Sequence, residues 1–163
     1  MFPGMWRQGD WIRFTSYGSS VIYGRSDSTI NRHGIRIGTA EIYRVVEELP
    51  EVLDSMVVDL EYLGRPSFLP LFVVLRPGAE LDGALVERIK QQIRTKASGR
   101  HVPDAVVQVA EIPRTLTGKK MEVPVRKLLL GAELGQVVSP GAMVTPSSLD
   151  FFAEYAKALA HQR

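Results

Sequence analysis

The run Pro-Arg-Thr-Leu-Thr-Gly-Lys-Lys at residues 113–120 places two lysines directly after a glycine, a combination that could meet a phosphate group. The phosphate-binding loop of nucleotide hydrolases needs a second glycine five residues earlier, where this chain has Pro113. It also needs a serine or threonine after the first lysine, where this chain has Lys120. The spacing therefore excludes that loop, and the segment taken alone favours an exposed loop with two solvated lysines.

Residues 24–38 form a second candidate, because they contain three arginines and three glycines within a polar stretch. Glycine lets a ligand approach the backbone closely, and arginine offers forked donors that suit phosphate. A turn-rich connection with charges on the surface explains the same composition equally well. In either case we expect the stretch to be too polar for the core.

Single carboxylates and histidines give weaker signals. Asp10 lies at the start of a predicted strand and could accept hydrogen bonds from two ribose hydroxyls, although a lone aspartate in a turn more often caps backbone amides. His33, His101 and His161 lie far apart in the sequence and show no metal-ligand spacing, so we expect no metal site.

The elements that must position these residues follow from the apolar periodicity. A hairpin is predicted from strands at 11–15 and 19–23, and Thr39 is expected to cap a helix that ends before Pro50. A second helix is expected to start at the cap Asp82 and to stop at Gly99. Further segments have the composition of strands at 56–60, 71–75 and 105–109, and of a helix at 122–130.

This order predicts an α+β fold: a small mixed sheet covered by helices, preceded by a short hairpin and a hinge, and followed by a C-terminal helical extension. The expected divisions are 1–26, 27–130 and 131–163. In the last part, Ser147 and Asp150 form a helix-start signal. The helix that follows would expose an apolar face unless it docks, and we expect it to dock on another domain. The residues of that face are Phe151, Phe152, Tyr155 and Leu159.

The composition limits the function classes. The chain has 163 residues, of which 45% are hydrophobic and 23% charged, with a net charge of +2 and no cysteine. The lack of cysteine excludes disulfide frameworks, thiolate zinc sites and cysteine nucleophiles. The balanced charge does not favour nucleic-acid or membrane binding, no apolar run approaches the length of a membrane helix, and the first residues lack the features of a signal peptide. We therefore expect a cytoplasmic protein that binds neither nucleic acid nor membrane.

Three motifs in this order resemble the C-terminal part of adenylate-forming acyl-CoA synthetases. They are Tyr-Gly-Arg-Ser-Asp at 23–27, Gly-Ile-Arg-Ile-Gly at 34–38 and Pro-Arg-Thr-Leu-Thr-Gly-Lys at 113–119. The resemblance covers residues 6–130. Within this superfamily the chain is most similar to the acetoacetyl-CoA synthetase subfamily, through the segments at 2–11, 118–125 and 149–152.

The resemblance implies roles for individual residues in forming the acyl-adenylate. Asp10 would hold the ribose hydroxyls of ATP, and Arg25 would contact the nucleotide near its ribose and phosphates. Lys119 would reach the carboxylate substrate and the α-phosphate. Asp27 would be the hinge about which the domain turns between the two half-reactions.

The resemblance also implies roles in thioester formation. Gly34 would line the passage for pantetheine, while Arg36 and Arg94 would meet the nucleotide of CoA. The chain departs from the common pattern at Ser28, where an acidic residue is frequent, and at Asn31, where a lysine is frequent.

The expected function is thus that of the lid domain of an ATP-dependent ligase that joins a short carboxylic acid, acetoacetate by its subfamily, to CoA. Expected substrates and cofactors are ATP with Mg²⁺, and CoA, none of them bound by this chain alone. The expected partners are an N-terminal adenylation domain of the same polypeptide, and a lysine acetyltransferase and deacetylase acting on Lys119. The alternative is a stand-alone α/β module that binds a nucleotide or RNA without catalysis.

Overall fold

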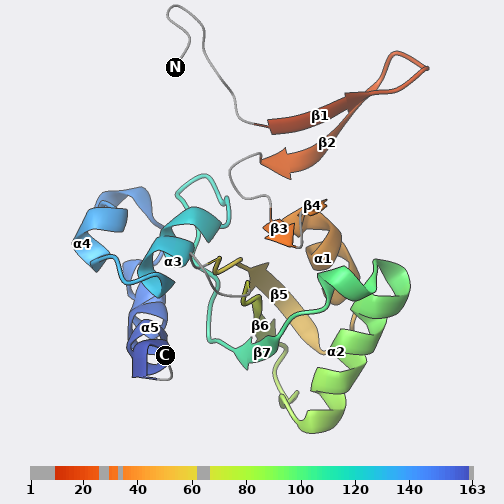
Figure 1. Ribbon diagram of the computed structural model, residues 1–163. Helices are drawn as coiled ribbons and strands as arrows, with labels where there is room; N and C mark the ends of the chain where they lie inside the picture. The colour runs from red at the N-terminus through yellow and green to blue at the C-terminus, as the bar shows by residue number, and fades with distance from the viewer. Residues whose placement is uncertain (1–9, 26–29, 33–34, 62–66, 162–163) are drawn as a thin grey trace, which may run out of the picture.

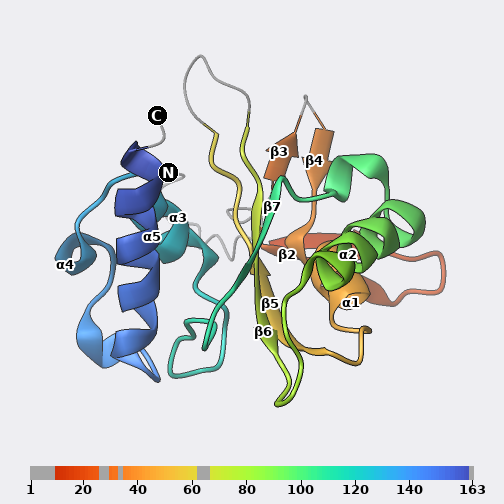
Figure 2. The same cartoon turned by 90° about the horizontal axis from the view of Figure 1, so that it is seen from below.

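The computed structural model of the protein describes residues 10–25, 30–32, 35–61 and 67–161. A three-stranded sheet lies between two groups of helices. Figure 2 shows α1 and α2 on one side of the sheet and α3, α4 and α5 on the other. The predicted α+β class, with a small mixed sheet under helices, is confirmed.

The sheet contains β5 (Val52–Val57), β6 (Pro70–Leu75) and β7 (Ala105–Gln108), with β6 in the centre. β5 runs antiparallel to β6, whereas β7 runs parallel to it. A parallel neighbour requires a long crossover, which is supplied here by α2 (Gly83–Lys96). β5 begins and ends earlier than the predicted strand at 56–60. The prediction missed the first part of β5 because the polar residues Asp54 and Ser55 interrupt the apolar pattern there.

The first face of the sheet is covered by α1 (Thr39–Val46) and α2, whose apolar sides face it. Asp82 caps α2 as predicted, accepting a hydrogen bond from the backbone of Leu85 at 2.7 Å. Thr39 does not cap α1: Gly38 is the N-cap, and Thr39 is the first helical residue and is buried. α2 ends at Lys96 with Ala97 as its C-cap, ahead of the predicted stop at Gly99, which instead opens the short 3₁₀ turn η1 (Gly99–His101).

The polar stretch at 24–38 contributes two short paired strands, β3 (Ile30–Arg32) and β4 (Ile35–Ile37). Ile30 and Ile37 are register partners, and both are buried in the core beneath α1 and α2. The expectation that this stretch stays out of the core is therefore wrong at these two positions. The prediction was made from the composition of the whole stretch, in which charged and small residues outnumber the two isoleucines.

The second face of the sheet is covered by α3 (Glu122–Leu129) and by the end of the chain, which forms α4 (Leu134–Val137) and α5 (Asp150–His161). Short 3₁₀ turns, η2 (Pro140–Ala142) and η3 (Pro146–Leu149), lead into α5. Side chains alternate along β6, so that Leu71 and Val73 enter the first core while Phe72 enters the second.

The buried side of the final helix rests on this chain's own sheet, and its docking on another domain stays a prediction. Phe152 is fully buried, with its ring 4.8 Å from that of Phe72 in an edge-to-face arrangement. Tyr155 meets the same phenylalanine at 5.6 Å, whereas Phe151 stays exposed. The C-terminal extension is thus a structural layer of this sheet.

The predicted hairpin is present as β1 (Asp10–Phe14) and β2 (Ser20–Arg25), which pair antiparallel. Figure 1 shows it extending away from the layered part of the molecule. Several large apolar side chains on it are exposed: Ile12, Phe14, Tyr17, Val21 and Ile22. Among the described residues, no helix combines the length and apolar composition needed to cross a bilayer.

Candidate functional site

Lys119 lies in a tight loop between β7 and α3. The Thr115 amide donates to the Lys119 carbonyl at 2.9 Å, and the Gly118 amide donates to the Thr115 carbonyl at 2.8 Å. Gly118 has a φ of 80°, a left-handed conformation that glycine adopts without a steric cost. The glycine before the lysine therefore serves to close this turn, and Thr115 Oγ1 accepts a further bond from the Lys119 amide at 3.1 Å.

The Lys119 side chain is exposed, and its ammonium has no hydrogen-bond or ion-pair partner within the ranges that the structure describes. The backbone that carries it is nevertheless fixed by several bonds. An ammonium on a fixed backbone and a free side chain can be presented to an external anion without first breaking an internal bond.

Lys120, the next residue, is held at the base of the loop. Its Nζ donates to Glu47 Oε1 at 2.7 Å and to the Ser55 carbonyl at 2.6 Å, and it lies 3.0 Å from Asp54 Oδ1. The same ammonium lies 3.9 Å from the centre of the Tyr43 ring. Only 15% of the side chain is exposed, so Lys120 is a structural cation.

Arg114 lies opposite Lys120 at the base of the loop and stabilises the loop from that side. Its Nη1 donates to the Gly118 carbonyl at 2.7 Å, while its Nη2 donates to Asp54 Oδ2 at 2.6 Å. Partial burial acts to raise the pKa of Asp54, but hydrogen bonds from Arg114 and Lys120 and the charge of Lys120 outweigh it and hold the pKa below its ordinary value. Asp54 is thus a carboxylate that links both basic residues to β5.

Tyr43 forms the wall beneath Lys120. Its hydroxyl donates to Glu122 Oε1 at 2.5 Å and accepts from the Val57 amide at 3.2 Å. Burial, together with the neighbouring Glu122 carboxylate, raises the pKa of this phenol well above its ordinary value. The phenol therefore stays neutral and ties α1, β5 and α3 together below the loop.

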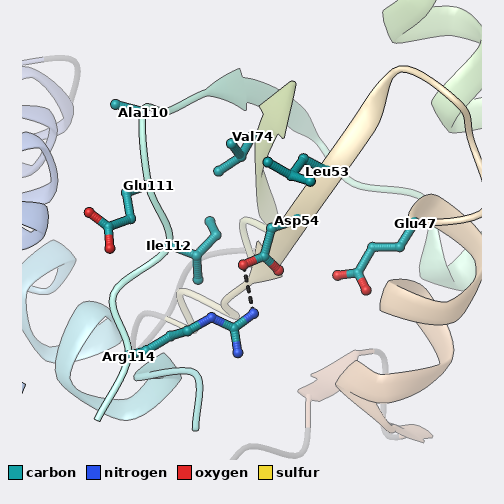
Figure 3. Close-up of a pocket in the computed structure, with 8 residues that line it drawn as sticks. All are labelled: Glu47, Leu53, Asp54, Val74, Ala110, Glu111, Ile112 and Arg114. Atoms are coloured by element: carbon teal, nitrogen blue, oxygen red, sulfur yellow. Dashed lines mark hydrogen bonds and ion pairs between the residues drawn. The ribbon is translucent and has the colours of Figure 1, made fainter. Parts of the chain in front are cut away.

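An open depression of about 470 Å³ lies beside the base of the loop. Figure 3 shows its lining and the bond between Arg114 and Asp54. The residues that line it are Glu47, Leu53, Asp54, Val74, Ala110, Glu111, Ile112 and Arg114. Arg114 is turned toward Asp54, so its charge is compensated inside the protein. No local pattern in the sequence indicates this cluster, because its members come from separate elements.

Arg94 lies on the exposed side of α2, where its Nη1 donates to Gln91 Oε1 at 3.2 Å within the same helix. Arg94 thus has a partner within its own helix, and among the described residues no hydrogen bond or ion pair joins it to Lys119.

Arg32, one of the three arginines of the polar stretch, is used internally. Its Nη1 donates to the Val102 carbonyl at 2.6 Å, and its Nη2 forms an ion pair with Asp104 at 2.7 Å. Asp104 Oδ2 also accepts from the Leu69 amide at 2.7 Å. The phosphate-binding hypothesis for the stretch therefore does not extend to Arg32, which ties β3 to the segment before β7.

The remaining predicted site residues are not tested by these contacts. Asp10 and Arg25 are register partners at the open end of the hairpin, and Arg36 pairs with Asn31 between β3 and β4, but their side chains are outside the description. Asp27 and Gly34 lie outside the described residues altogether.

Comparison with known proteins gives a family match. Residues 41–119 match the profile of the AMP-binding enzyme C-terminal domain. An acetoacetyl-coenzyme A synthetase of Rhizobium meliloti (strain 1021) is 43% identical over 93% of this chain and 23% of its own length.

Solved structures agree. The acetoacetyl-CoA synthetase of Streptomyces lividans superposes with a TM-score of 0.87 at 51% identity, over 97% of this chain and 23% of that one. An acyl-CoA synthetase of Brucella canis gives a TM-score of 0.59 at 31% identity, over 78% of this chain and 23% of that one. The chain thus spans less than a quarter of the length of these relatives.

Proposed function

We propose that this chain is the C-terminal, mobile part of an AMP-forming acid–CoA ligase whose acid is acetoacetate. The observation that carries the proposal is an exposed lysine on a rigidly held loop, without an ammonium partner among the described residues, at the end of a segment that matches the AMP-binding C-terminal domain family. The names of the relatives support acetoacetate as the acid.

In the first half-reaction a carboxylate oxygen attacks the α-phosphorus of ATP, the bond to the bridging oxygen breaks, and pyrophosphate leaves. Negative charge gathers on the α-phosphate in the transition state. We propose that the Lys119 ammonium approaches this charge when the domain closes, because a pre-positioned cation stabilises developing charge strongly where water is excluded. Asp10 and Arg25 would hold the ribose and the phosphate side of the same nucleotide.

In the second half-reaction the CoA thiolate attacks the acyl carbon and AMP leaves. We propose that the domain turns about Asp27 and presents a different face. Gly34 would then line the pantetheine passage, with Arg36 and Arg94 toward the CoA nucleotide.

The partner of both faces would be an N-terminal adenylation domain. The apolar side chains exposed on the β1–β2 hairpin support this part of the proposal, because an isolated two-stranded hairpin with exposed Phe14 and Tyr17 is stabilised when another surface covers it. Within the described ranges no group of three or more metal-ligating side chains gathers.

We also propose that Lys119 is regulated by acetylation. An exposed ammonium without internal partners suits a lysine acetyltransferase and its deacetylase, which would remove and restore the Lys119 charge. A cytoplasmic location stays a prediction. No finding favours the alternative of a nucleic-acid-binding module.

The proposal is tested by measuring the two half-reactions separately in the full-length enzyme. Lys119→Ala should lower pyrophosphate release by about 10²–10³-fold, the usual cost of losing one charge-stabilising donor. It should retain acyl transfer from supplied acetoacetyl-AMP to CoA. Gly34→Leu should retain adenylation and lose transfer, because the added side chain would block the passage.

A thermal melt of each variant serves as the control for folding. Parallel losses of both half-reactions in both variants would contradict the proposed division between Lys119 and Gly34. Normal adenylation by Lys119→Ala would overturn the proposed role of the lysine.

A further inference from the structure

The C-terminal extension contacts the Lys119 loop directly. The Leu116 amide donates to the Ala142 carbonyl at 3.2 Å, and the Val144 amide donates to the Arg114 carbonyl at 3.1 Å. Thr115 and Met143 face each other between these bonds as an antiparallel bridge. Residues 142–144, here called the strap, thus add a short strand to the outer edge of the loop.

The strap is anchored independently of the loop. Met143 is 5% exposed and packs in the second core with Leu149 and Phe152. Immediately after the strap, Thr145 Oγ1 donates to Glu111 Oε1 at 2.9 Å, which fastens the chain to the segment that follows β7. Because the middle of the strap and the residue after it are tied to the body of the domain, the strap can transmit that rigidity to the loop.

The loop is consequently held from two sides. On the inner side its own return strand pairs Arg114 with Lys120, and the Arg114 guanidinium reaches across to the Gly118 carbonyl. On the outer side, among the residues that the structure describes, only the strap contacts it through backbone hydrogen bonds. Without the strap, the amide of Leu116 and the carbonyl of Arg114 would lose their partners, and the turn that carries Lys119 would be braced at its base alone.

We propose that the strap is a positioning element for Lys119: it sets the direction from which the ammonium enters the adenylation site. The inference rests on the proposed role of Lys119 in adenylation. Catalysis of this kind depends on placement within about 1 Å, so loosening the outer edge of the loop should slow adenylation and leave thioester formation unchanged.

The sharpest test removes one strap hydrogen bond without changing the core. Val144→Pro deletes the amide that donates to Arg114, while the Val144 side chain is 58% exposed and has little packing to lose. The residue before it, Met143, has φ −119° and ψ 151°, an extended conformation that is compatible with a following proline. Val144→Ala, which keeps the amide, is the matched control.

In the full-length enzyme, Val144→Pro should lower the rate of pyrophosphate release by about 10-fold or more, with acyl transfer from supplied acetoacetyl-AMP within about twofold of wild type. Val144→Ala should match wild type in both. The ratio of the two rates in one preparation does not depend on the fraction folded, so partial unfolding cannot imitate the result.

Leu116→Pro provides a second variant should Val144→Pro fold poorly. It removes the other strap bond at the position after Thr115 in the turn, where proline is favoured, and the Leu116 side chain is exposed. A selective loss of adenylation in either proline variant supports the inference. An unchanged ratio in a folded proline variant overturns it, provided that Lys119→Ala loses adenylation in the same assay; if Lys119→Ala does not, the proposed function itself fails.

Discussion

The tip and the base of the loop at 113–120 treat two neighbouring lysines in opposite ways. At the tip, Lys119 is fixed only through its backbone, and its ammonium is free of partners among the described residues. At the base, the Lys120 ammonium is shared by two carboxylates, a carbonyl and an aromatic ring. One peptide bond therefore separates a side chain available for chemistry from one used for structure.

The difference shows how a small domain can offer a mobile charge on a rigid support. Loop ends are commonly the least stable parts of a fold, and a flexible loop would place its lysine poorly. Here the base of the loop is held by ion pairs, because Lys120 and Arg114 both contact Asp54. The ammonium that acts on a ligand can then remain free to move without loosening the loop.

The largest effect is expected when each lysine in turn is replaced by methionine and the free energy of unfolding is measured. Lys120→Met should lower the free energy of unfolding by about 1–3 kcal/mol, because it removes the ammonium that donates to the Ser55 carbonyl and pairs with the Asp54 carboxylate. Lys119→Met should change it by no more than about 0.5 kcal/mol, as is usual at exposed positions. Urea denaturation of both variants measures the difference. Equal destabilisation would mean that the tip is as structural as the base.

A smaller difference is expected in chemical reactivity. Limited treatment of the folded protein with an amine-acylating reagent should modify Lys119 about 10 times faster than Lys120, because the Lys120 ammonium must first leave hydrogen bonds worth about 1.4 kcal/mol or more. Tandem mass spectrometry distinguishes the two sites. The same treatment in denaturant is the control, and there the two rates should converge. A ratio near one in the folded protein would refute the distinction.

The smallest effect concerns pH. Because the pKa of Asp54 is depressed in the folded state, its contribution to stability is fully present above the usual aspartate pKa of about 3.9 and is lost as the pH falls through the lower, folded value. The melting temperature of wild type should therefore fall more steeply below pH 4 than that of Asp54→Asn. Glu154→Gln removes a carboxylate that is 72% exposed and should keep the wild-type slope. Identical slopes for all three proteins would show that Asp54 carries none of the acid sensitivity.

The sequence predicted the fold well wherever apolar periodicity was continuous. The stripe of Leu85, Ile89 and Ile93 defined α2, and the aspartate before it was correctly identified as its cap. The prediction failed where polar residues enter the core with partners from elsewhere. Asp54 and Ser55 interrupt β5 in the sequence, and the distant Arg114 and Lys120 help to make their burial favourable.

Lys119 was singled out by a motif, because motif recognition needs only neighbours in the chain, and its catalytic role stays a prediction. The network at the loop base joins residues up to 73 positions apart, and the strap joins residues 28 positions apart, so no local pattern could reveal them. The same limit explains why Arg32 was grouped with ligand-binding arginines, since its partners Val102 and Asp104 lie 70 and 72 positions away.

The central strand β6 is buried on both faces, and this has a consequence for strand register. In a sheet with one solvent-exposed face, a register slip of one residue is unfavourable because it would expose apolar side chains. In this sheet, a β6 strand shifted by one residue would still bury its apolar side chains. It would instead drive Phe72 into the aliphatic side beneath α1 and α2, and leave the Phe152 ring without its edge-to-face neighbour. Correct pairing therefore depends on the shapes of the two cores rather than on their hydrophobicity, and aromatic residues on one side with branched aliphatics on the other supply that difference.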